Sequence, residues 1–86
     1  MYTVVFTTEA EADLSRFDKP IVQRILKKIR WLAENFNLII PEALVGQWQG
    51  LYKLRVGNYR VLYCFDKNKQ QIIVHLVGHR RNIYNI

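Results

Sequence analysis

The sixteen residues LYKLRVGNYRVLYCFD, at positions 51–66, decide the fold of this chain. Apolar and polar residues alternate over 52–56 and 59–61, on the two sides of Gly57-Asn58, a pattern typical of two half-buried strands joined by a tight turn. Glycine at the first central position suits a two-residue type II′ hairpin turn. We therefore expect paired antiparallel strands at 51–56 and 59–66.

The register of this hairpin predicts a cluster of positive charge. Side chains alternate between the faces of a strand, so Arg55 lies opposite Arg60 and Lys53 shares their face. Like charges directly opposite each other destabilise a sheet by up to about 1 kcal/mol. A phosphate bound among the three cations would explain the arrangement, because a guanidinium matches paired phosphate oxygens and an ammonium can act as a point charge or proton carrier. An ordinary solvated outer face is the alternative.

The segment before the hairpin predicts one strand and a first helix. Residues 2–7 are β-branched and aromatic, as in a strand. Thr8 and Glu11 have the spacing of a capping box, which opens a helix that runs to about Phe17. The second face of the hairpin is apolar and should form the core beneath the helices; it carries Tyr52, Leu54, Val56, Tyr59, Val61 and Tyr63.

A second helix should begin at Asp18 and Pro20, because proline is tolerated only in the first helical turn. Its apolar residues recur at steps of four and three and form one stripe that ends at about Phe36. Lys27 and Lys28 lie off this stripe. They belong either to a solvated helix face or to a secondary contact with an RNA backbone.

The remaining segments complete an α+β domain. Residues 37–50 indicate a loop, in which we interpret Trp48 as a packing anchor, with a platform for base stacking as the alternative. Residues 71–77 predict a last strand. The element order predicts a single domain over residues 1–86, in which the N-terminal strand is followed by a helical hairpin and then by a three-stranded antiparallel meander. The meander forms one sheet with the first strand.

The positive charge is concentrated in the second half of the chain. Residues 1–50 carry six basic and six acidic side chains, whereas residues 51–86 carry seven basic side chains and Asp66 alone. The formal net charge of +6 therefore lies in the last 36 residues. Such an asymmetry indicates a polyanionic partner, either nucleic acid or an acidic protein segment.

The composition argues against several classes of protein. The single cysteine, Cys64, cannot form an intramolecular disulfide, and no Cys/His spacing resembles a zinc site. The N-terminal residues lack the basic region of a signal peptide, and no run approaches the roughly 18–20 apolar residues of a membrane span. We expect a cytoplasmic protein that does not associate with a membrane.

The C-terminal segment adds further candidates near the cationic cluster. Arg80 and Arg81 contribute positive charge, and His79 is the one imidazole near the cluster and a candidate acid or base. A phenol beside several cations, at Tyr84, can donate a proton or stack on a base. His75 lies among apolar residues and is interpreted as structural.

The scarcity of acidic residues in the second half of the chain limits the reactions that the site can catalyse. Asp66 is the only acidic residue after position 42, so the paired carboxylates of two-metal phosphoryl transfer are absent. A basic site can still cleave RNA, because the 2′-OH of RNA attacks the adjacent phosphate and cations stabilise the charge that develops in the transition state. We therefore expect a site that needs neither a metal ion nor another cofactor.

Two segments resemble motifs of the RelE/ParE toxin superfamily. They are WQGLYKLRVGNYRVLY at residues 48–63 and GHRRNIY at residues 78–84. Together with the strand–helix–helix opening, the resemblance covers essentially the whole chain. It implies the toxin of a type II toxin–antitoxin pair: a metal-independent endoribonuclease, or mRNA interferase, that cuts mRNA at the ribosome and is held inactive by its cognate antitoxin.

The resemblance also implies roles for individual residues. Lys53 and Arg55 match the basic strand residues of the family, one of which would activate the 2′-OH while its neighbours bind phosphate. Arg60 and Arg80 match arginines that stabilise the transition state. Tyr84 matches a C-terminal tyrosine that stacks on or orients the substrate base.

Some assignments stay open at this point. Arginine is a poorer base than lysine, so Arg55 leaves the identity of the general base and acid open, with His79 as a further candidate. Arg81, Lys27 and Lys28 are expected to contact RNA. Two other functions compete with the nuclease: a ParE-like toxin that binds and poisons DNA gyrase, and a non-catalytic RNA-binding module.

Overall fold

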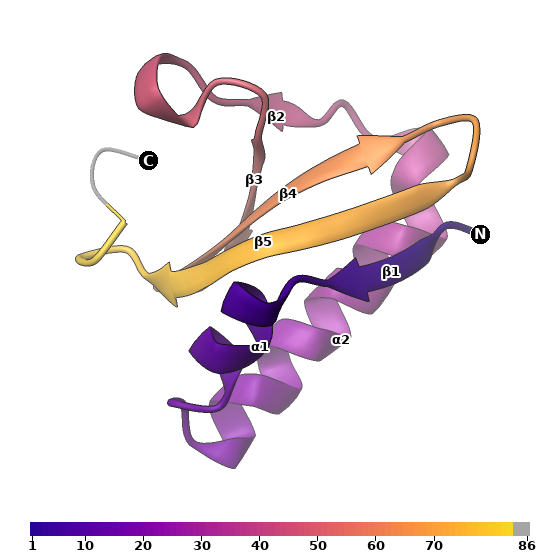
Figure 1. The fold of residues 1–86 in the computed structure, drawn as a ribbon. Helices are drawn as coiled ribbons and strands as arrows, with labels where there is room; N and C mark the ends of the chain where they lie inside the picture. The colour runs from indigo at the N-terminus through magenta and orange to yellow at the C-terminus, as the bar shows by residue number, and fades with distance from the viewer. Residues whose placement is uncertain (84–86) are drawn as a thin grey trace.

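The structure, a computed structural model, describes residues 1–83 (Figure 1). Its elements in chain order are β1 (Thr3–Phe6), α1 (Thr8–Leu14), α2 (Lys19–Asn35), the 3₁₀ helix η1 (Phe36–Leu38), β2 (Glu42–Ala43), the 3₁₀ helix η2 (Gly46–Trp48), β3 (Tyr52–Val56), β4 (Tyr59–Asp66) and β5 (Gln71–His79). The strands form one five-stranded sheet in the order β1-β5-β4-β3-β2. β1 runs parallel to β5, and the other neighbours are antiparallel.

The sheet confirms the predicted α+β class and the meander β3-β4-β5, and it corrects one element. The segment 37–50, predicted as a loop, contains β2, which pairs Glu42 with Lys53 and Ala43 with Tyr52. Two residues are too short a run to show strand periodicity in a sequence, so this edge strand could not be recognised there.

The start of α1 differs from the predicted capping box. Thr7, and not Thr8, is the N-cap, and its Oγ1 accepts a hydrogen bond from the N–H of Ala10 at 3.1 Å. The same hydroxyl donates to the carbonyl oxygen of His75 at 3.2 Å. Thr7 therefore begins the helix and also ties it to β5. The helix ends at Leu14, earlier than predicted.

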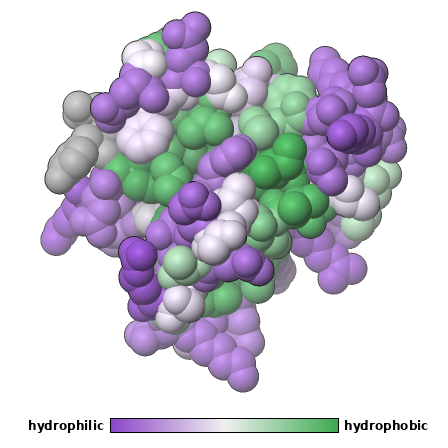
Figure 2. Space-filling view, in the orientation of Figure 1, coloured by the Kyte–Doolittle hydropathy of each residue, from purple (hydrophilic) through white to green (hydrophobic). Residues whose placement is uncertain are grey.

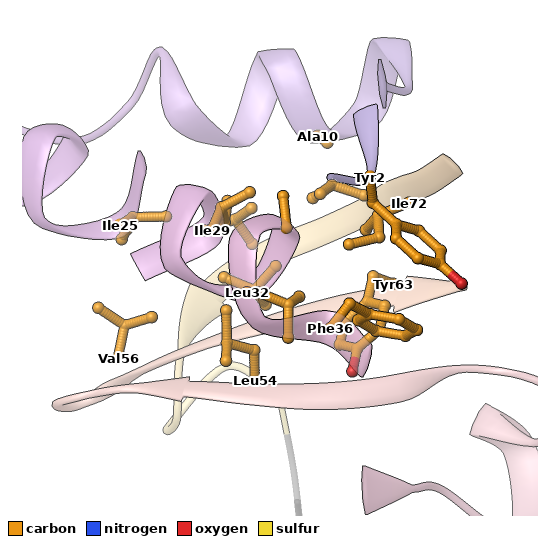
Figure 3. Close-up of a cluster of buried hydrophobic side chains, with 14 residues drawn as sticks. Tyr2, Ala10, Ile25, Ile29, Leu32, Phe36, Leu54, Val56, Tyr63 and Ile72 are labelled. Atoms are coloured by element: carbon orange, nitrogen blue, oxygen red, sulfur yellow. The ribbon is translucent and has the colours of Figure 1, made fainter. Parts of the chain in front are cut away.

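The apolar stripe of α2 packs on one face of the sheet and forms the core (Figure 3). Ile25, Ile29 and Leu32 are at most 2% exposed. From the sheet, Tyr63 is 1% exposed and meets Phe36 edge-on, with ring centroids 6.2 Å apart. The apolar face of the hairpin is thus in the core, as predicted, and its cationic face points away from the helices.

β5 extends beyond the end of β1, and α1 lies beside the part that β1 does not reach. There, Oδ2 of Asp13 accepts a hydrogen bond from the N–H of Val77 at 3.0 Å. Val77 is 3% exposed, so this bond satisfies a buried backbone donor that no neighbouring strand pairs.

The surface is mixed in character. Figure 2 shows hydrophobic areas in the middle of the view, with hydrophilic residues between them and around the margins. The most exposed large apolar side chains of the segment 37–50 are Leu38, Ile40 and Val45. Within residues 1–83, no helix is both long enough and apolar enough to cross a bilayer.

Candidate active site

The hairpin places two arginines opposite each other, in the predicted register. Arg55 of β3 pairs with Arg60 of β4, and Val56 pairs with Tyr59. Gly57 has a φ of 58°, which is the left-handed conformation that a type II′ turn requires at its first central position. The turn therefore fixes the register, and the register brings the two cations together.

Arg60 is a buried cation with an unsatisfied donor. It is 6% exposed, and its Nη1 donates to the carbonyl oxygens of Gly57 and Tyr59, at 2.9 Å each. Its Nε is buried and has no hydrogen-bond partner among residues 1–83. Burial, followed by repulsion from Arg55 and Arg80, lowers the pKa of Arg60 below its ordinary value. An anion bound beside this guanidinium would supply the partner that its Nε lacks.

The end of β5 brings Arg80 toward this group. The backbone N–H of Arg80 donates to the carbonyl oxygen of Asn58 at 2.8 Å, which ties the C-terminal segment to the hairpin turn. Gly78 lies opposite Arg60, and a Cβ added to Gly78 would lie only 2.9 Å from Cδ1 of Ile83. Glycine at this position therefore lets the C-terminal turn fold closely over the strand.

Lys53 also lies on this face, but it is not a free cation. It is 9% exposed, and its Nζ lies 3.0 Å from Oε2 of Glu42. The cationic face that the sequence predicts therefore also carries one carboxylate. The sequence contains Glu42, but only the pairing of β2 with β3 shows that its side chain meets Lys53.

The structure does not bring His79 together with the cationic cluster. β5 has a bulge opposite Leu62 and Tyr63, where His75 is the extra residue. The side chains after His75 therefore lie on the opposite face from the one that simple alternation predicts. His79 consequently lies opposite Tyr59 on the helix-covered face, with ring centroids 5.3 Å apart. Its Nδ1 accepts a hydrogen bond from the N–H of Arg81 at 3.1 Å.

His75 lies within the sheet, as the structural interpretation requires. Its Nε2 is 3.1 Å from Sγ of Cys64. Burial raises the pKa of the Cys64 thiol. Trp48 is half-buried beside Leu76 and Ile83 in a hollow of about 340 Å³, which agrees with its interpretation as a packing residue.

The other predicted site residues lie at varying distances from the cluster. Lys27 and Lys28 line a hollow of about 400 Å³ that also includes Arg55. Arg81 is exposed in the turn after β5. Tyr84 lies outside the described residues. Within residues 1–83, no three His, Cys, Asp or Glu side chains gather as a metal ion would require.

A known family matches almost the whole sequence. The family described as "ParE toxin of type II toxin-antitoxin system, parDE" matches residues 4–84. The chain is also 30% identical to "Toxin RelG" from Mycobacterium tuberculosis (strain ATCC 25618 / H37Rv) over 83 residues, which are 96% of this chain and 95% of that protein.

Solved structures share the fold. The toxin–antitoxin complex RelBE2 from M. tuberculosis contains a chain that matches with a TM-score of 0.81 and 30% identity, over 92% of this chain and 98% of that one. The isolated E. coli RelE toxin matches with a TM-score of 0.75 over 92% of this chain and 84% of that one. At 18% identity, the second likeness concerns the fold alone.

Proposed function

Because this chain belongs to the RelE/ParE superfamily of type II toxin–antitoxin toxins, we propose that it is an mRNA-cleaving endoribonuclease whose active site is the cationic face of the β3–β4 hairpin. The single observation that carries this proposal is Arg60, a buried guanidinium whose Nε has no partner among the described residues. The repulsion from Arg55 and Arg80 on this group is larger than the attraction from Glu42. A phosphate that gains negative charge in the transition state would supply the missing partner.

The reaction uses a nucleophile that belongs to the substrate. The 2′-oxygen of one nucleotide attacks the adjacent phosphorus, the bond from phosphorus to the 5′-oxygen breaks, and one proton moves from the 2′-OH while another reaches the leaving oxygen. The products are a 2′,3′-cyclic phosphate and a 5′-hydroxyl. Arg60 and Arg80 would stabilise the extra charge on the phosphate oxygens.

The remaining residues would bind and orient the substrate. Lys53 is held in an ion pair with Glu42, so we assign it as a cation that contacts the phosphate. Arg55 is exposed opposite Arg60 and can contact the same strand of RNA. Tyr84 is a further proposal, as a residue that orients the substrate base.

The partners follow from the family and from the charge. The M. tuberculosis relative was solved as a toxin–antitoxin complex, and we propose that this chain likewise binds a cognate antitoxin and acts on mRNA at the ribosome. A net charge of +6 gives long-range attraction to an acidic antitoxin segment, so association should slow as the salt concentration rises.

We consider a second function because the matching family is described as a ParE toxin. A toxin of that kind would bind DNA gyrase without cutting RNA. One translation reaction with added DNA gyrase and plasmid separates the functions: cleaved mRNA supports the nuclease, gyrase-dependent DNA breaks support the alternative, and RNA binding without either product indicates a binding module.

A further inference from the structure

The edge of the sheet beside α2 is open over most of β3. β2 pairs only with Tyr52 and Lys53, so within residues 1–83 the strand from Leu54 to Val56 has no paired strand on that side. Helix α2 runs beside this edge, and its Arg24 reaches the hairpin turn. A Cβ added to Gly57 would lie 2.6 Å from Nη2 of Arg24.

Two adjoining hollows lie along this edge. The first, of about 400 Å³, lies between α2 and the end of β3. The second, of about 280 Å³, reaches the Lys53–Glu42 pair. Lys28, Trp31 and Arg55 line both hollows. The two hollows therefore form one path from the outer face of the sheet to α2.

The first hollow is lined by cations that have no counter-ion in the described part of the chain. Arg24, Lys27, Lys28 and Arg55 border it, and no acidic side chain of residues 1–83 does. Among residues 1–83, none of these four cations takes part in an ion pair, whereas Arg30 of the same helix pairs with Glu34 at 3.5 Å. This part of α2 therefore differs from an ordinary solvated face, which balances its charges along the helix.

An exposed indole lies among these cations. Trp31 is 41% exposed, and Nζ of Lys28 lies 4.1 Å from the centroid of its ring. Cations alone would suit an acidic peptide equally well. A nucleic acid strand offers phosphates to the cations and also flat bases that can stack on an indole, so it matches both features.

We propose that this hollow is a second binding site for single-stranded RNA, continuous with the active site. Arg24, Lys27 and Arg55 contact successive phosphates, and a nucleobase stacks on Trp31. The strand leaves the cationic face of the hairpin past Arg55 and turns around the open edge of β3. That this RNA strand is the substrate rests on the proposed function, whereas the binding of single-stranded RNA in the hollow does not.

The test measures binding of a probe that cannot be cut. The chain has two tryptophans, so Trp48→Phe leaves Trp31 as the only indole. The probe is a 2′-O-methyl oligouridine of about twelve nucleotides, a length within the range of known single-strand sites. Binding should quench the fluorescence of Trp31, and in the wild-type protein Trp31→Leu should weaken binding about tenfold, as expected for the loss of one stacked base.

The charge is tested with matched double variants. Arg24→Ala/Lys27→Ala should weaken binding and lower the slope of log affinity against log salt by about 1.4, since each phosphate contact of a single strand contributes about 0.7. Lys67→Ala/Lys69→Ala removes the same charge from the turn between β4 and β5 and should have a much smaller effect. Equal losses from the two double variants would overturn the proposal.

Two further results would also overturn it. One is the absence of Trp31 quenching on binding. The other is equally tight binding and equal quenching by oligoglutamate, which would make the hollow a site for an acidic protein segment. Because the probe is not cleaved, quenching together with a lack of mRNA cleavage would refute the proposed function while leaving this site in place.

Discussion

Nζ of the buried Lys53 lies 3.0 Å from Oε2 of Glu42, whose side chain is 55% exposed. Among the described cations of the hairpin face, Lys53 is therefore the one with a protein counter-ion. Glu42 belongs to a two-residue edge strand and is open to solvent, so an incoming phosphate can take its place beside Lys53. The carboxylate then competes with the substrate for the same cation.

Removing this competitor should strengthen RNA binding. Glu42→Gln keeps the shape of the side chain and removes a negative charge near the phosphate. Charges a few ångströms apart at a protein surface interact by about 1 to 4 kcal/mol, which sets an upper range for the effect. We expect about a tenfold gain in affinity for 2′-O-methyl RNA at low salt, measured by fluorescence anisotropy.

The matched control for this variant is Glu34→Gln, which removes the same charge from the pair with Arg30 on α2. It should change the affinity far less. Equal gains from the two variants would mean that only net charge matters, and weaker binding by Glu42→Gln would contradict the competition.

The edge of β5 gives a prediction about stability. Asp13→Ala should lower the free energy of unfolding by about 1–3 kcal/mol, because the buried N–H of Val77 loses its acceptor. Asp13→Asn keeps an acceptor oxygen and should cost less. Arg16→Ala removes only the 3.5 Å ion pair to Asp13 and should be nearly silent in chemical denaturation, because Arg16 is exposed. A large loss from Arg16→Ala would mean that the ion pair is the stabilising contact.

The buried phenol of Tyr63 makes the free energy of unfolding depend on pH in the alkaline range. Burial, with smaller effects from Tyr52 and Glu42, raises the pKa of Tyr63 from 10.0 to about 12. The unfolded state loses this proton first, so stability is complete below pH 10 and falls as the pH rises toward 12. In Tyr63→Phe this fall should be smaller, by on the order of 2 kcal/mol, in denaturation curves recorded across that range. Identical curves for the two proteins would contradict the raised pKa.

The chemistry of the RNA ends is a further prediction. Attack by the 2′-OH leaves a 5′-hydroxyl on one fragment and a cyclic or 3′-phosphate on the other. Cutting of ribosome-free RNA at high protein concentration should survive EDTA, because the proposed nucleophile needs no metal-bound water. Fragments with 5′-phosphates, or strict dependence on an added metal ion, would contradict this mechanism.

The sequence was sufficient to predict the hairpin and its charges. The two-residue turn at Gly57-Asn58 fixes which side chains face each other, so the pairing of Arg55 with Arg60 follows from local chemistry. The burial of Arg60 could not be predicted, because it depends on carbonyl oxygens of the turn folding over its guanidinium.

The features that the sequence did not reveal depend on contacts between distant segments. β2 forms only because the segment 37–50 folds back on β3, and that contact brings Glu42 to Lys53. The bulge in β5 changes which face His79 occupies, and an alternating pattern cannot show one inserted residue. Both features alter the candidate site, one by adding a carboxylate and the other by removing an imidazole.

The central claim concerns the arginines of the cationic face, and Arg80 is the more direct test of the two. Arg60 holds two carbonyl oxygens of the hairpin, so Arg60→Ala also disturbs the fold, whereas the side chain of Arg80 is exposed. The decisive measurement is the single-turnover rate at which Arg80→Ala cleaves ribosome-bound mRNA, with Lys67→Ala as the control. We predict a loss of about 10²–10³-fold for Arg80→Ala, the scale expected when one preorganised donor is removed, with an unchanged melting temperature and a control at the wild-type rate. An Arg80→Ala protein that cleaves as fast as the wild type would show that this face is not the nuclease site.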